Sequence, residues 1–284
     1  MTIVVTGATG FLGAAMLPLL AERDEVVALH RPGATPAPAQ RVRWVAQDLA
    51  GELSAELPDR VDSVLHIAQS RRYREFPAGA VDVVAVNTMA TARLLDYCHR
   101  AGGRTFVFAS TGAVSGAGPE PIDEDAPPRP SNLYAVSKHA GEQLVEQYRS
   151  VLLAHSLRYF FIYGPGQRGM MMPGIIERVA GGQEVQLAGD NGISLNPVYV
   201  EDAVRATVAA LDLTESATVN VAGPQVVTIR EIAQLIADEL GTEPAFVNLA
   251  PQPDFVASTE RMARLLGAPT TSPREGLART IAAR

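Results

Sequence analysis

The first 23 residues constrain the fold of this chain more than any other segment. Thr2–Thr6 is a short β-branched run of the kind that forms a buried strand. Gly7, Gly10 and Gly13 follow it at three-residue spacing, and Phe11–Arg23 continues as an amphipathic helix. A strand, a glycine turn and a helix N-terminus present backbone N–H groups and the positive end of a helix dipole to an anion. The segment therefore predicts a βα unit that binds the pyrophosphate of a dinucleotide.

The chain up to about residue 165 repeats this alternation of strands and helices, which is typical of a parallel sheet. We predict an α/β fold, with a Rossmann-type doubly wound parallel sheet over residues 1–165. Residues 166–284 are expected to form mainly a small C-terminal substrate-binding lobe, with some segments returning to the core. The clearest helix of this lobe is Thr228–Leu240, which starts with a capping box and ends at Gly241. The expected strands are 2–6, 25–30, 43–46, 61–67, 104–109 and 156–162.

Tyr134 and Lys138 are the first candidate catalytic residues. They lie four residues apart in a segment predicted as a helix over residues 134–151, so both side chains can point into one pocket. A phenol has a pKa near ~10 in water, which is too high for efficient proton transfer at neutral pH. A cation beside it favours the phenolate, and we expect Lys138 to lower the pKa of Tyr134 in this way. The pair is a candidate general acid/base for an oxygen atom.

Several further landmarks follow the glycine turn in a familiar order. They include two apolar strands, an asparagine in a long helix, a Tyr-Gly-Pro-Gly loop and two late segments. In chain order they are Val64–Ala68, Asn87, Phe106–Thr111, Tyr163–Gly166, Val198–Ala203 and Asn220–Gly223. With these landmarks the chain resembles the extended short-chain dehydrogenases/reductases, specifically the NAD-dependent epimerase/dehydratase-like family, nearly from end to end.

This resemblance implies roles for single residues. Tyr134 would exchange a proton with the substrate oxygen, Lys138 would hold the nicotinamide ribose and assist Tyr134, and Thr111 would hydrogen-bond the same oxygen. Ser110 remains the competing hydroxyl, because the register could differ by one residue. Hydride would move to or from the nicotinamide, whose chemistry belongs to the cofactor. The implied cofactor-binding residues are Gly7, Thr9, Gly10, Phe11, Leu12, Gly13, His30, Arg31, Asp48, Leu49, Ala68, Tyr134 and Lys138.

The end of the second strand bears on the choice of cofactor. A dinucleotide fold that selects NAD usually carries Asp or Glu there, which binds the ribose 2′-hydroxyl. This strand instead ends in His30 and Arg31, and no carboxylate occurs between Glu25 and Asp48. A guanidinium suits a 2′-phosphate, so the sequence favours NADP over NAD. By resemblance, Asp48 and Leu49 would lie at the adenine.

The substrate is predicted from three departures from the family pattern. Relatives that act on nucleotide sugars bind the diphosphate through an Asn and two Arg, where this chain has Phe161, Leu195 and Pro251–Asp254, a stretch without a basic residue. A buried diphosphate without cationic partners is poorly stabilised, so a non-nucleotide, fairly apolar substrate is favoured. The candidate substrate contacts are Thr111, Phe161, Arg168 and Met171. Gly112 and Ala113 replace the acidic pair of the sugar dehydratases, which disfavours dehydration.

Three functions remain open at this point. The first is an NADPH-dependent ketoreductase or alcohol dehydrogenase acting on a non-nucleotide, fairly apolar carbonyl or alcohol substrate. The second is an NAD-dependent sugar or nucleotide-sugar epimerase or dehydrogenase with different substrate contacts. The third is a non-catalytic dinucleotide-binding sensor, which the retained Thr111, Tyr134 and Lys138 disfavour.

Composition sets the remaining expectations. The chain has 284 residues, a net charge of −7 and no long apolar run, so neither nucleic acid nor a membrane is an expected partner. No metal site is predicted. The first strand begins at residue 2 and Cys98 is the single cysteine, so we expect a cytoplasmic location. Two helices over residues 87–102 and 134–151 would pair in a homodimer, as the resemblance implies.

Overall fold

The computed structural model describes residues 1–118 and 121–284. The chain divides into two compact units. The first unit comprises residues 1–114, 127–158 and 204–219, and the second comprises residues 115–126, 159–203 and 220–284. The units alternate along the chain, whereas the division predicted at residue 165 is a functional one and stays a prediction. Among the helices formed by the described residues, none combines the length and the apolar character needed to cross a bilayer.

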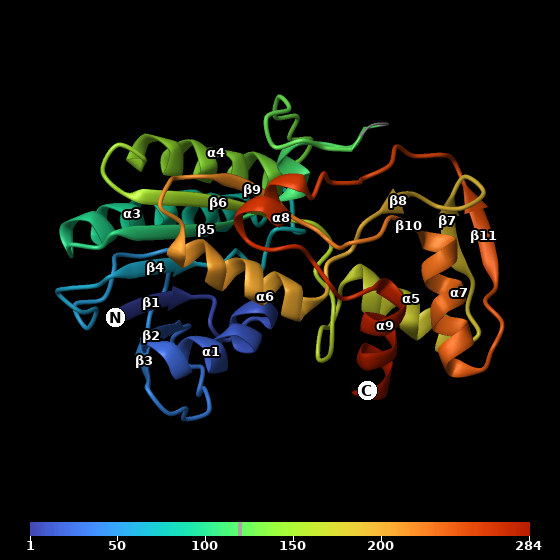
Figure 1. The fold of residues 1–284 in the computed structure, drawn as a ribbon, viewed down its shortest axis with the longest axis horizontal. Coiled ribbons are helices and arrows are strands. Elements are labelled where there is room, and N and C mark those ends of the chain that lie inside the picture. Colours follow the sequence, from blue (N-terminus) through green and yellow to red (C-terminus); the bar gives the residue numbers. More distant parts are fainter. Residues whose placement is uncertain (119–120) are drawn as a thin grey trace. The chain divides into compact units, whose positions relative to one another are not determined.

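A seven-stranded sheet forms the centre of the first unit (Figure 1). Its strand order is β3-β2-β1-β4-β5-β6-β9, and the order reverses between β1 and β4, as at the ligand-binding switch point of doubly wound sheets. The pairs β1–β2, β2–β3, β1–β4 and β4–β5 are parallel, with Val4 aligned to both Val27 and Val64. The strands are β1 (Thr2–Thr6), β2 (Glu25–His30), β3 (Val42–Ala46), β4 (Ser63–His66), β5 (Thr105–Thr111), β6 (Leu153–Tyr159) and β9 (Thr218–Val221).

Helices cover both faces of this sheet, as predicted for a doubly wound fold. Figure 1 shows α3 and α4 on one face and α1 on the other. The helices that contribute to this unit are α1 (Phe11–Arg23), α2 (Ala80–Val84), a π-helical turn (Ala85–Met89), α3 (Ala90–Arg100), α4 (Leu133–Tyr148) and α6 (Val200–Ala209), with 3-10 turns at Gly112–Val114 and Ala210–Asp212. Asn132 caps α4, because its side chain accepts a hydrogen bond from the Ala135 N–H at 3.0 Å.

One hydrophobic cluster of this unit lies between the sheet and the helices α3 and α4, and Met16 and Leu20 of α1 are also fully buried. Strand residues such as Val64, Phe106 and Phe108 are fully buried, and Leu94 and Leu95 of α3 pack in the same cluster. Burying side chains of this size is the main favourable term in folding, about 1.5–3 kcal/mol for each one. Cys98 belongs to the same cluster and is fully buried, which agrees with a packing role.

The sixth strand differs from the expectation of 156–162, because it runs from Leu153 to Tyr159. Pairing already begins at Leu153, whose N–H donates to the Arg104 carbonyl at 2.9 Å. The strand cannot continue to residue 162, because Phe161 has a φ of 47°, in the left-handed region that a strand does not visit. An apolar run alone does not reveal such a change of backbone conformation.

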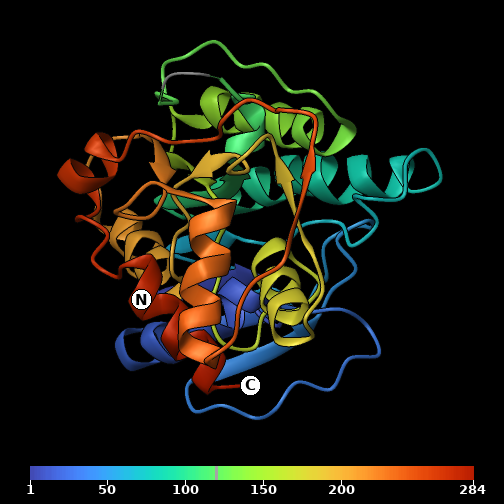
Figure 2. The same cartoon turned by 90° about the vertical axis from the view of Figure 1, so that its right-hand side faces the viewer.

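The second unit contains helices and two small two-stranded sheets. β11 pairs with β7 in parallel, and β10 pairs with β8 antiparallel. The predicted capping box at Thr228 and Glu231 is present, and Gly241 ends that helix with a φ of 64°. Figure 2 shows α7 with α5 and α9 beside it. The elements are α5 (Met171–Ala180), β7 (Val185–Ala188), β8 (Ser194–Leu195), β10 (Val227–Thr228), α7 (Ile229–Leu240), β11 (Phe246–Leu249), α8 (Glu260–Leu265) and α9 (Pro273–Ala282).

Candidate functional site

The glycine turn between β1 and α1 is built by close backbone contacts. Gly7 has a φ of 70°, and a Cβ on it would lie 2.7 Å from the backbone nitrogen of Ala68. A Cβ on Gly13 would overlap with the carbonyl oxygen of Gly7. Gly10 has more space, because its nearest neighbour, the same oxygen, would lie 3.1 Å from a Cβ. Gly7 therefore shapes the turn, Gly13 lets α1 pack on it, and Gly10 leaves the N-terminus of α1 accessible.

The N-terminus of α1 has the properties of an anion site. Gly10 is its N-cap, no side chain caps the first N–H groups, and the first turn carries no acidic residue. In contrast, side chains of Asn132, Thr228 and Ser272 cap α4, α7 and α9. A pyrophosphate at this end would accept hydrogen bonds from the uncapped N–H groups and interact favourably with the helix dipole. The residues present, Thr9 to Gly13, thus fit the predicted dinucleotide.

The ends of β2 and β3 carry the other residues predicted for the dinucleotide. Arg31 is exposed, and the ring of His30 donates from Nδ1 to the Arg31 carbonyl at 2.9 Å. The same ring stands edge-on to Trp44, with 6.1 Å between ring centres. Asp48 is exposed and accepts from the Ala50 N–H at 3.0 Å, while Leu49 is half-buried. The Arg31 side chain is therefore available to a ligand at this edge of the sheet.

A buried network of hydrogen bonds surrounds His66 at the end of β4. His66 lies between the hydroxyls of Thr6 and Thr91, at 2.7 and 3.1 Å. Burial, together with the nearby charge of Lys138, lowers the pKa of His66 to about 3, so its ring stays neutral. Thr6 also accepts from the Ala68 N–H at 3.1 Å. This network fixes the backbone of Ala68 against the glycine turn.

The phenol of Tyr134, in the first turn of α4, is held by two side chains. It donates to Oε1 of Gln69 at 3.0 Å, and the Thr111 hydroxyl makes a second hydrogen bond to it. Thr111 is oriented in turn by the Ala113 N–H, which donates to its oxygen at 3.3 Å. Burial raises the pKa of Tyr134 to about 12, partly offset by Thr111. The expectation that Lys138 lowers this pKa is therefore wrong in this structure, because desolvation of the phenol dominates.

Lys138 lies one turn further along α4 and is 1 % exposed. Its ammonium donates to the Ala109 carbonyl at 2.8 Å and stands 4.9 Å from the centre of the Phe108 ring. Burial lowers the pKa of Lys138 to about 7, although the carboxylate of Glu142 favours the charged form. A buried ammonium with these contacts can hydrogen-bond a ribose hydroxyl. In this structure it donates to the Ala109 carbonyl and not to the Tyr134 phenol.

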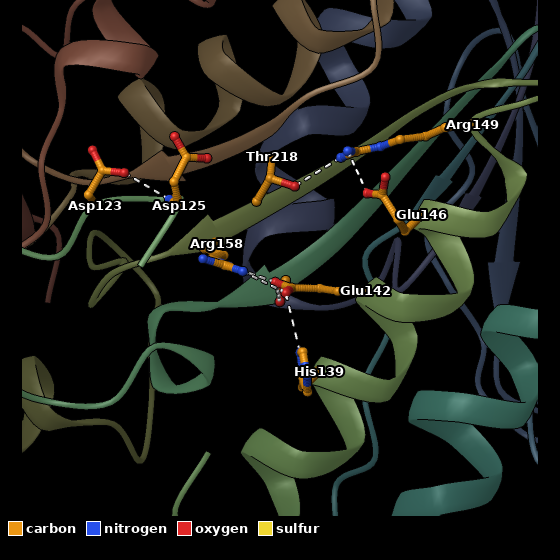
Figure 3. A network of polar contacts seen from close by, with 9 residues as sticks. Asp123, Asp125, His139, Glu142, Glu146, Arg149, Arg158 and Thr218 are labelled. Atoms are coloured by element: carbon orange, nitrogen blue, oxygen red, sulfur yellow. Dashed lines mark hydrogen bonds and ion pairs between the residues drawn. The ribbon is translucent and has the colours of Figure 1, made fainter. Parts of the chain in front are cut away.

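Ser110 and Thr111 have different surroundings, although they are neighbours at the end of β5. Ser110 donates to Oε1 of Glu142 at 2.5 Å. Glu142 also forms a bidentate ion pair with Arg158, at 2.9 and 2.8 Å, and all three side chains are buried. Figure 3 shows Glu142 with Arg158 on one side and His139, 3.8 Å away, on the other. The same figure shows Arg149, which forms an ion pair with Glu146 and donates a hydrogen bond to the Thr218 hydroxyl. Of the two hydroxyls at the end of β5, Thr111 is the one that contacts the Tyr134 phenol.

Residues 69–75 follow β4 and were not singled out by the sequence. Besides Gln69, the ring of Tyr73 packs against the ring of Tyr134, with 5.2 Å between centres, and the Arg74 guanidinium lies 5.1 Å from the Tyr73 ring. Arg72 pairs with Glu75 at 2.7 Å and donates to the Ala78 carbonyl, whereas Arg71 is exposed. The run Arg-Arg-Tyr-Arg at 71–74 was the sequence feature that could have drawn attention to this segment. No local pattern showed that it contacts Tyr134, which lies about 60 positions further along the chain.

The remaining substrate candidates lie in the second unit. Phe161, with its left-handed backbone, is half-buried and stands edge-on to Phe255, with 5.5 Å between ring centres. Leu195 is fully buried, Arg168 is exposed and Met171 is half-buried at the start of α5. Asp254 accepts from the Ser194 N–H at 2.7 Å, so its carboxylate is used inside this unit. Phe161 therefore forms part of an aromatic cluster and offers no polar group.

Comparison with known proteins covers the whole chain. A UDP-glucuronic acid 4-epimerase from Bacillus cereus, solved with UDP-glucuronic acid and NAD, is 26% identical with a TM-score of 0.88, over 100% of this chain and 98% of that one. An uncharacterised UDP-glucose epimerase of Bacillus subtilis (strain 168) is 28% identical over 99% of this chain and 97% of its own. GDP-6-deoxy-D-mannose reductase of Pseudomonas aeruginosa (strain PAO1) is 31% identical over 88% and 86%.

The family match agrees with the site geometry. The model of the NAD-dependent epimerase/dehydratase family matches residues 3–222, which include the glycine turn, Thr111, Tyr134 and Lys138. The expected resemblance, the Rossmann-like sheet and the enzyme class are thus confirmed. This chain is an enzyme that belongs to the NAD-dependent epimerase/dehydratase family of the extended short-chain dehydrogenases/reductases.

Proposed function

We propose that this protein is a nucleotide-sugar 4-epimerase that uses a retained NAD, with Tyr134 as its proton-transferring residue. The observation that carries the proposal is the end-to-end match to an epimerase solved with UDP-glucuronic acid and NAD. It favours the second function considered above over a ketoreductase for non-nucleotide substrates. The nicotinamide, when bound, would take a hydride from the sugar carbon and return it.

The geometry of the first unit supports roles for its polar side chains. Tyr134 exchanges the proton of the sugar hydroxyl, and Thr111, which already contacts the phenol, hydrogen-bonds the same oxygen. Lys138 binds the nicotinamide ribose and supplies the positive charge that favours a phenolate once it moves off the Ala109 carbonyl. Ser110 is assigned a structural role, because its hydroxyl is bound to Glu142.

NAD is proposed as the dinucleotide because the matched epimerase contains it. Gly7 to Gly13 bind its pyrophosphate, Ala68 lies beneath it, and Asp48 and Leu49 contact the adenine. The preference for NADP inferred from His30 and Arg31 finds no support in this neighbour. We assign Arg31 a contact with solvent or with the outer face of the adenosine.

The exposed guanidinium groups near Tyr134 support a substrate that carries negative charge. Arg71 and Arg74 belong to the segment whose Tyr73 packs on Tyr134, although the whole chain has a net charge of −7. A positive patch beside a catalytic group in an acidic protein attracts anionic ligands. These arginines provide cations next to the ring that packs on Tyr134.

A nucleotide-sugar ketoreductase is the second candidate, because a GDP-sugar reductase is 31% identical to this chain. It would use the same Tyr134 proton, but it would consume one reduced dinucleotide for each product.

Apolar side chains support a homodimer for either enzyme. Val81 and Val84 of α2, Met89 of the π-helical turn and Val136 of α4 are exposed, and α2 contacts α4.

The test is to incubate the purified protein with UDP-glucuronic acid, UDP-glucose and a nucleotide 4-ketosugar, each with NAD, NADH and NADPH. Proton NMR of the anomeric signal reports epimerisation, and absorbance of the reduced nicotinamide reports net reduction. We expect epimerisation without net change in NADH, and a loss of ~10²-fold or more in Tyr134→Phe. Net consumption of reduced dinucleotide would support the reductase, and turnover of simple ketones alone would overturn both proposals.

A further inference from the structure

Gln69 is the acceptor of the phenolic hydrogen of Tyr134, at 3.0 Å, across 65 residues of sequence. No cation contacts the phenol in the first unit as described, since the Lys138 ammonium donates to Ala109 and the other partner of the phenol is Thr111. The amide oxygen of Gln69 thus accepts a hydrogen bond from the proton that the proposed reaction moves. Nothing in the local sequence around Tyr134 or Gln69 indicates this contact.

The backbone on both sides of Gln69 is fixed by buried side chains. The Ala68 N–H donates to Oγ1 of Thr6 at 3.1 Å, and the Ser70 N–H donates to Oδ1 of Asn87 at 2.8 Å. The Gln69 side chain is therefore presented from an anchored segment. Groups held in this way by a second layer of hydrogen bonds keep the geometry that proton transfer needs.

Asn87 links this segment directly to the helix that carries Tyr134. Its Nδ2 donates to Oγ of Ser137 at 3.0 Å, and Ser137 donates to the Tyr134 carbonyl at 2.8 Å. Asn87 and Ser137 are almost completely buried. One buried asparagine therefore sets the spacing between the Gln69 backbone and the Tyr134 backbone.

A terminal amide suits a group that changes between phenol and phenolate. Its oxygen can accept from the phenol, and after rotation about the last side-chain torsion its NH₂ can donate to the phenolate. A carboxylate could only accept and would repel the phenolate, and an ammonium could only donate. Since the proposed epimerisation needs Tyr134 as base and then as acid in one turnover, a partner for both states has a clear use.

We propose that Gln69 is a positioning residue that keeps the Tyr134 phenol aimed in both of its protonation states, by accepting from the phenol and donating to the phenolate. The proposal rests on the proposed acid/base role of Tyr134, and it concerns a residue outside the predicted Thr111, Tyr134 and Lys138 set. No bond other than O–H is made or broken in this step, and the proton moves between the substrate hydroxyl and Oη of Tyr134.

The first experiment uses Gln69→Met, which keeps the length of the side chain and removes both hydrogen bonds. Hydrogen bonds to a charged oxygen are stronger than those to a neutral one, so losing both disfavours the phenolate more than the phenol. We expect kcat to fall about 3- to 10-fold with little change in KM, and the ionisation in the pH profile of kcat to move to higher pH. The matched control is Gln143→Met, an exposed change on α4, the helix that carries Tyr134. This variant should match the wild type.

A second measurement does not require turnover. In Gln69→Lys a cation would replace the amide, and the phenol of Tyr134 should titrate at least one pH unit lower, measured by ultraviolet phenolate absorbance with Tyr134→Phe subtracted. If the wild type turns over no nucleotide sugar but this shift occurs, the proposed function fails and the Gln69 contact stands. An unshifted titration in a folded Gln69→Lys protein, or a pH profile of Gln69→Met that is unchanged or moves to lower pH, would overturn the inference.

Discussion

The hydroxyl of Ser110 donates to the carboxylate of Glu142 at 2.5 Å, inside a buried ion pair with Arg158. This contact distinguishes two adjacent hydroxyls that the sequence left as competitors. The oxygen of Ser110 is engaged in holding β5 to α4, whereas Thr111 turns toward the Tyr134 phenol. Charge-assisted hydrogen bonds of this kind are worth about 1.5–3 kcal/mol, and leaving a buried carboxylate without one is costly.

We therefore expect opposite phenotypes for two single substitutions. Ser110→Ala should lower the free energy of unfolding by about 1–3 kcal/mol and leave kcat of the folded enzyme within a few-fold of wild type. Thr111→Val should lower kcat about 10- to 100-fold with little loss of stability, because it removes a hydrogen bond to the reacting oxygen. Urea unfolding and steady-state kinetics measure both. The reverse pattern would identify Ser110 as the catalytic hydroxyl.

His155 predicts a loss of stability in acid. It is fully buried in β6, and neither ring nitrogen has a hydrogen-bond partner among residues 1–118 and 121–284. Burial, and secondarily the charge of Arg149, lowers its pKa from 6.5 to about 4. The unfolded chain then binds a proton that the folded one does not between pH 6.5 and about 4, so stability is lost as the pH falls through this window, by up to about 3 kcal/mol.

His155→Leu removes this titration and two unpaired nitrogens with little change in volume. We expect the variant to be as stable as the wild type or more stable at pH 7, and to lose less stability on acidification to pH 4. Urea unfolding across this pH range tests the difference. His66 titrates in the same direction in both proteins and serves as the internal background. Equal pH dependence of the two proteins would contradict the expectation.

Arg31 gives a prediction on the relative affinities for NADH and NADPH. If NAD is the cofactor, NADH should bind at least as tightly as NADPH, as measured by nicotinamide fluorescence. Of the two dinucleotides only NADPH carries a 2′-phosphate with which a guanidinium can pair, so Arg31→Ala should weaken NADPH about 10-fold, or about 1.4 kcal/mol, and change NADH less than about 2-fold. Wild-type protein that prefers NADPH ~10-fold or more would restore the preference inferred from the sequence and favour a reductase.

Arg71 and Arg74 give a prediction on substrate charge. Replacing either by Ala should raise KM for UDP-glucuronic acid about 2- to 5-fold, since partly exposed ion pairs contribute modestly. The effect should weaken as salt is added, because exposed charges are screened. Arg100→Ala removes the same charge from the end of α3, where Arg100 pairs with Asp96, and is the control. An equal rise in the control would mean that only net charge matters.

The exposed apolar side chains predict self-association. Val84 is 42% exposed on α2, and Val81 on the same helix is 84% exposed. If these residues bury each other in a dimer, Val84→Glu places a charge in an apolar interface and should shift the protein to monomer in light scattering coupled to size exclusion. Glu239→Gln, an exposed change on α7 outside these helices, is the control. A wild-type monomer at micromolar concentration would refute the homodimer.

The sequence predicted those parts of the site that depend on local spacing. Gly7, Gly10 and Gly13 lie within one turn and one helix start, and Tyr134 and Lys138 lie on one helix face, so their relative positions follow from secondary structure alone. The order of strands also predicted that the end of the fifth strand, with Ser110 and Thr111, would lie at the site. These features needed no knowledge of distant contacts.

Other features could not be read from the chain. Gln69 reaches Tyr134 only because Asn87 and Thr6 fix the loop after β4, and such contacts span 17 to 65 residues. The pKa of Tyr134 rises because the phenol is buried, whereas the sequence shows only that a lysine is near. The end of β6 depends on the backbone of Phe161, which no pattern of apolar residues encodes.

The packing of the glycine turn has a consequence for how such chains evolve. Gly7 is required by the nearby backbone of Ala68 and by its own φ, and Gly13 by the carbonyl of Gly7, whether or not any nucleotide is bound. A descendant that lost its chemistry would still unfold if either were replaced by a larger residue. Selection for a folded protein alone would thus preserve both glycines, while Thr111, Tyr134 and Gln69 would be free to drift.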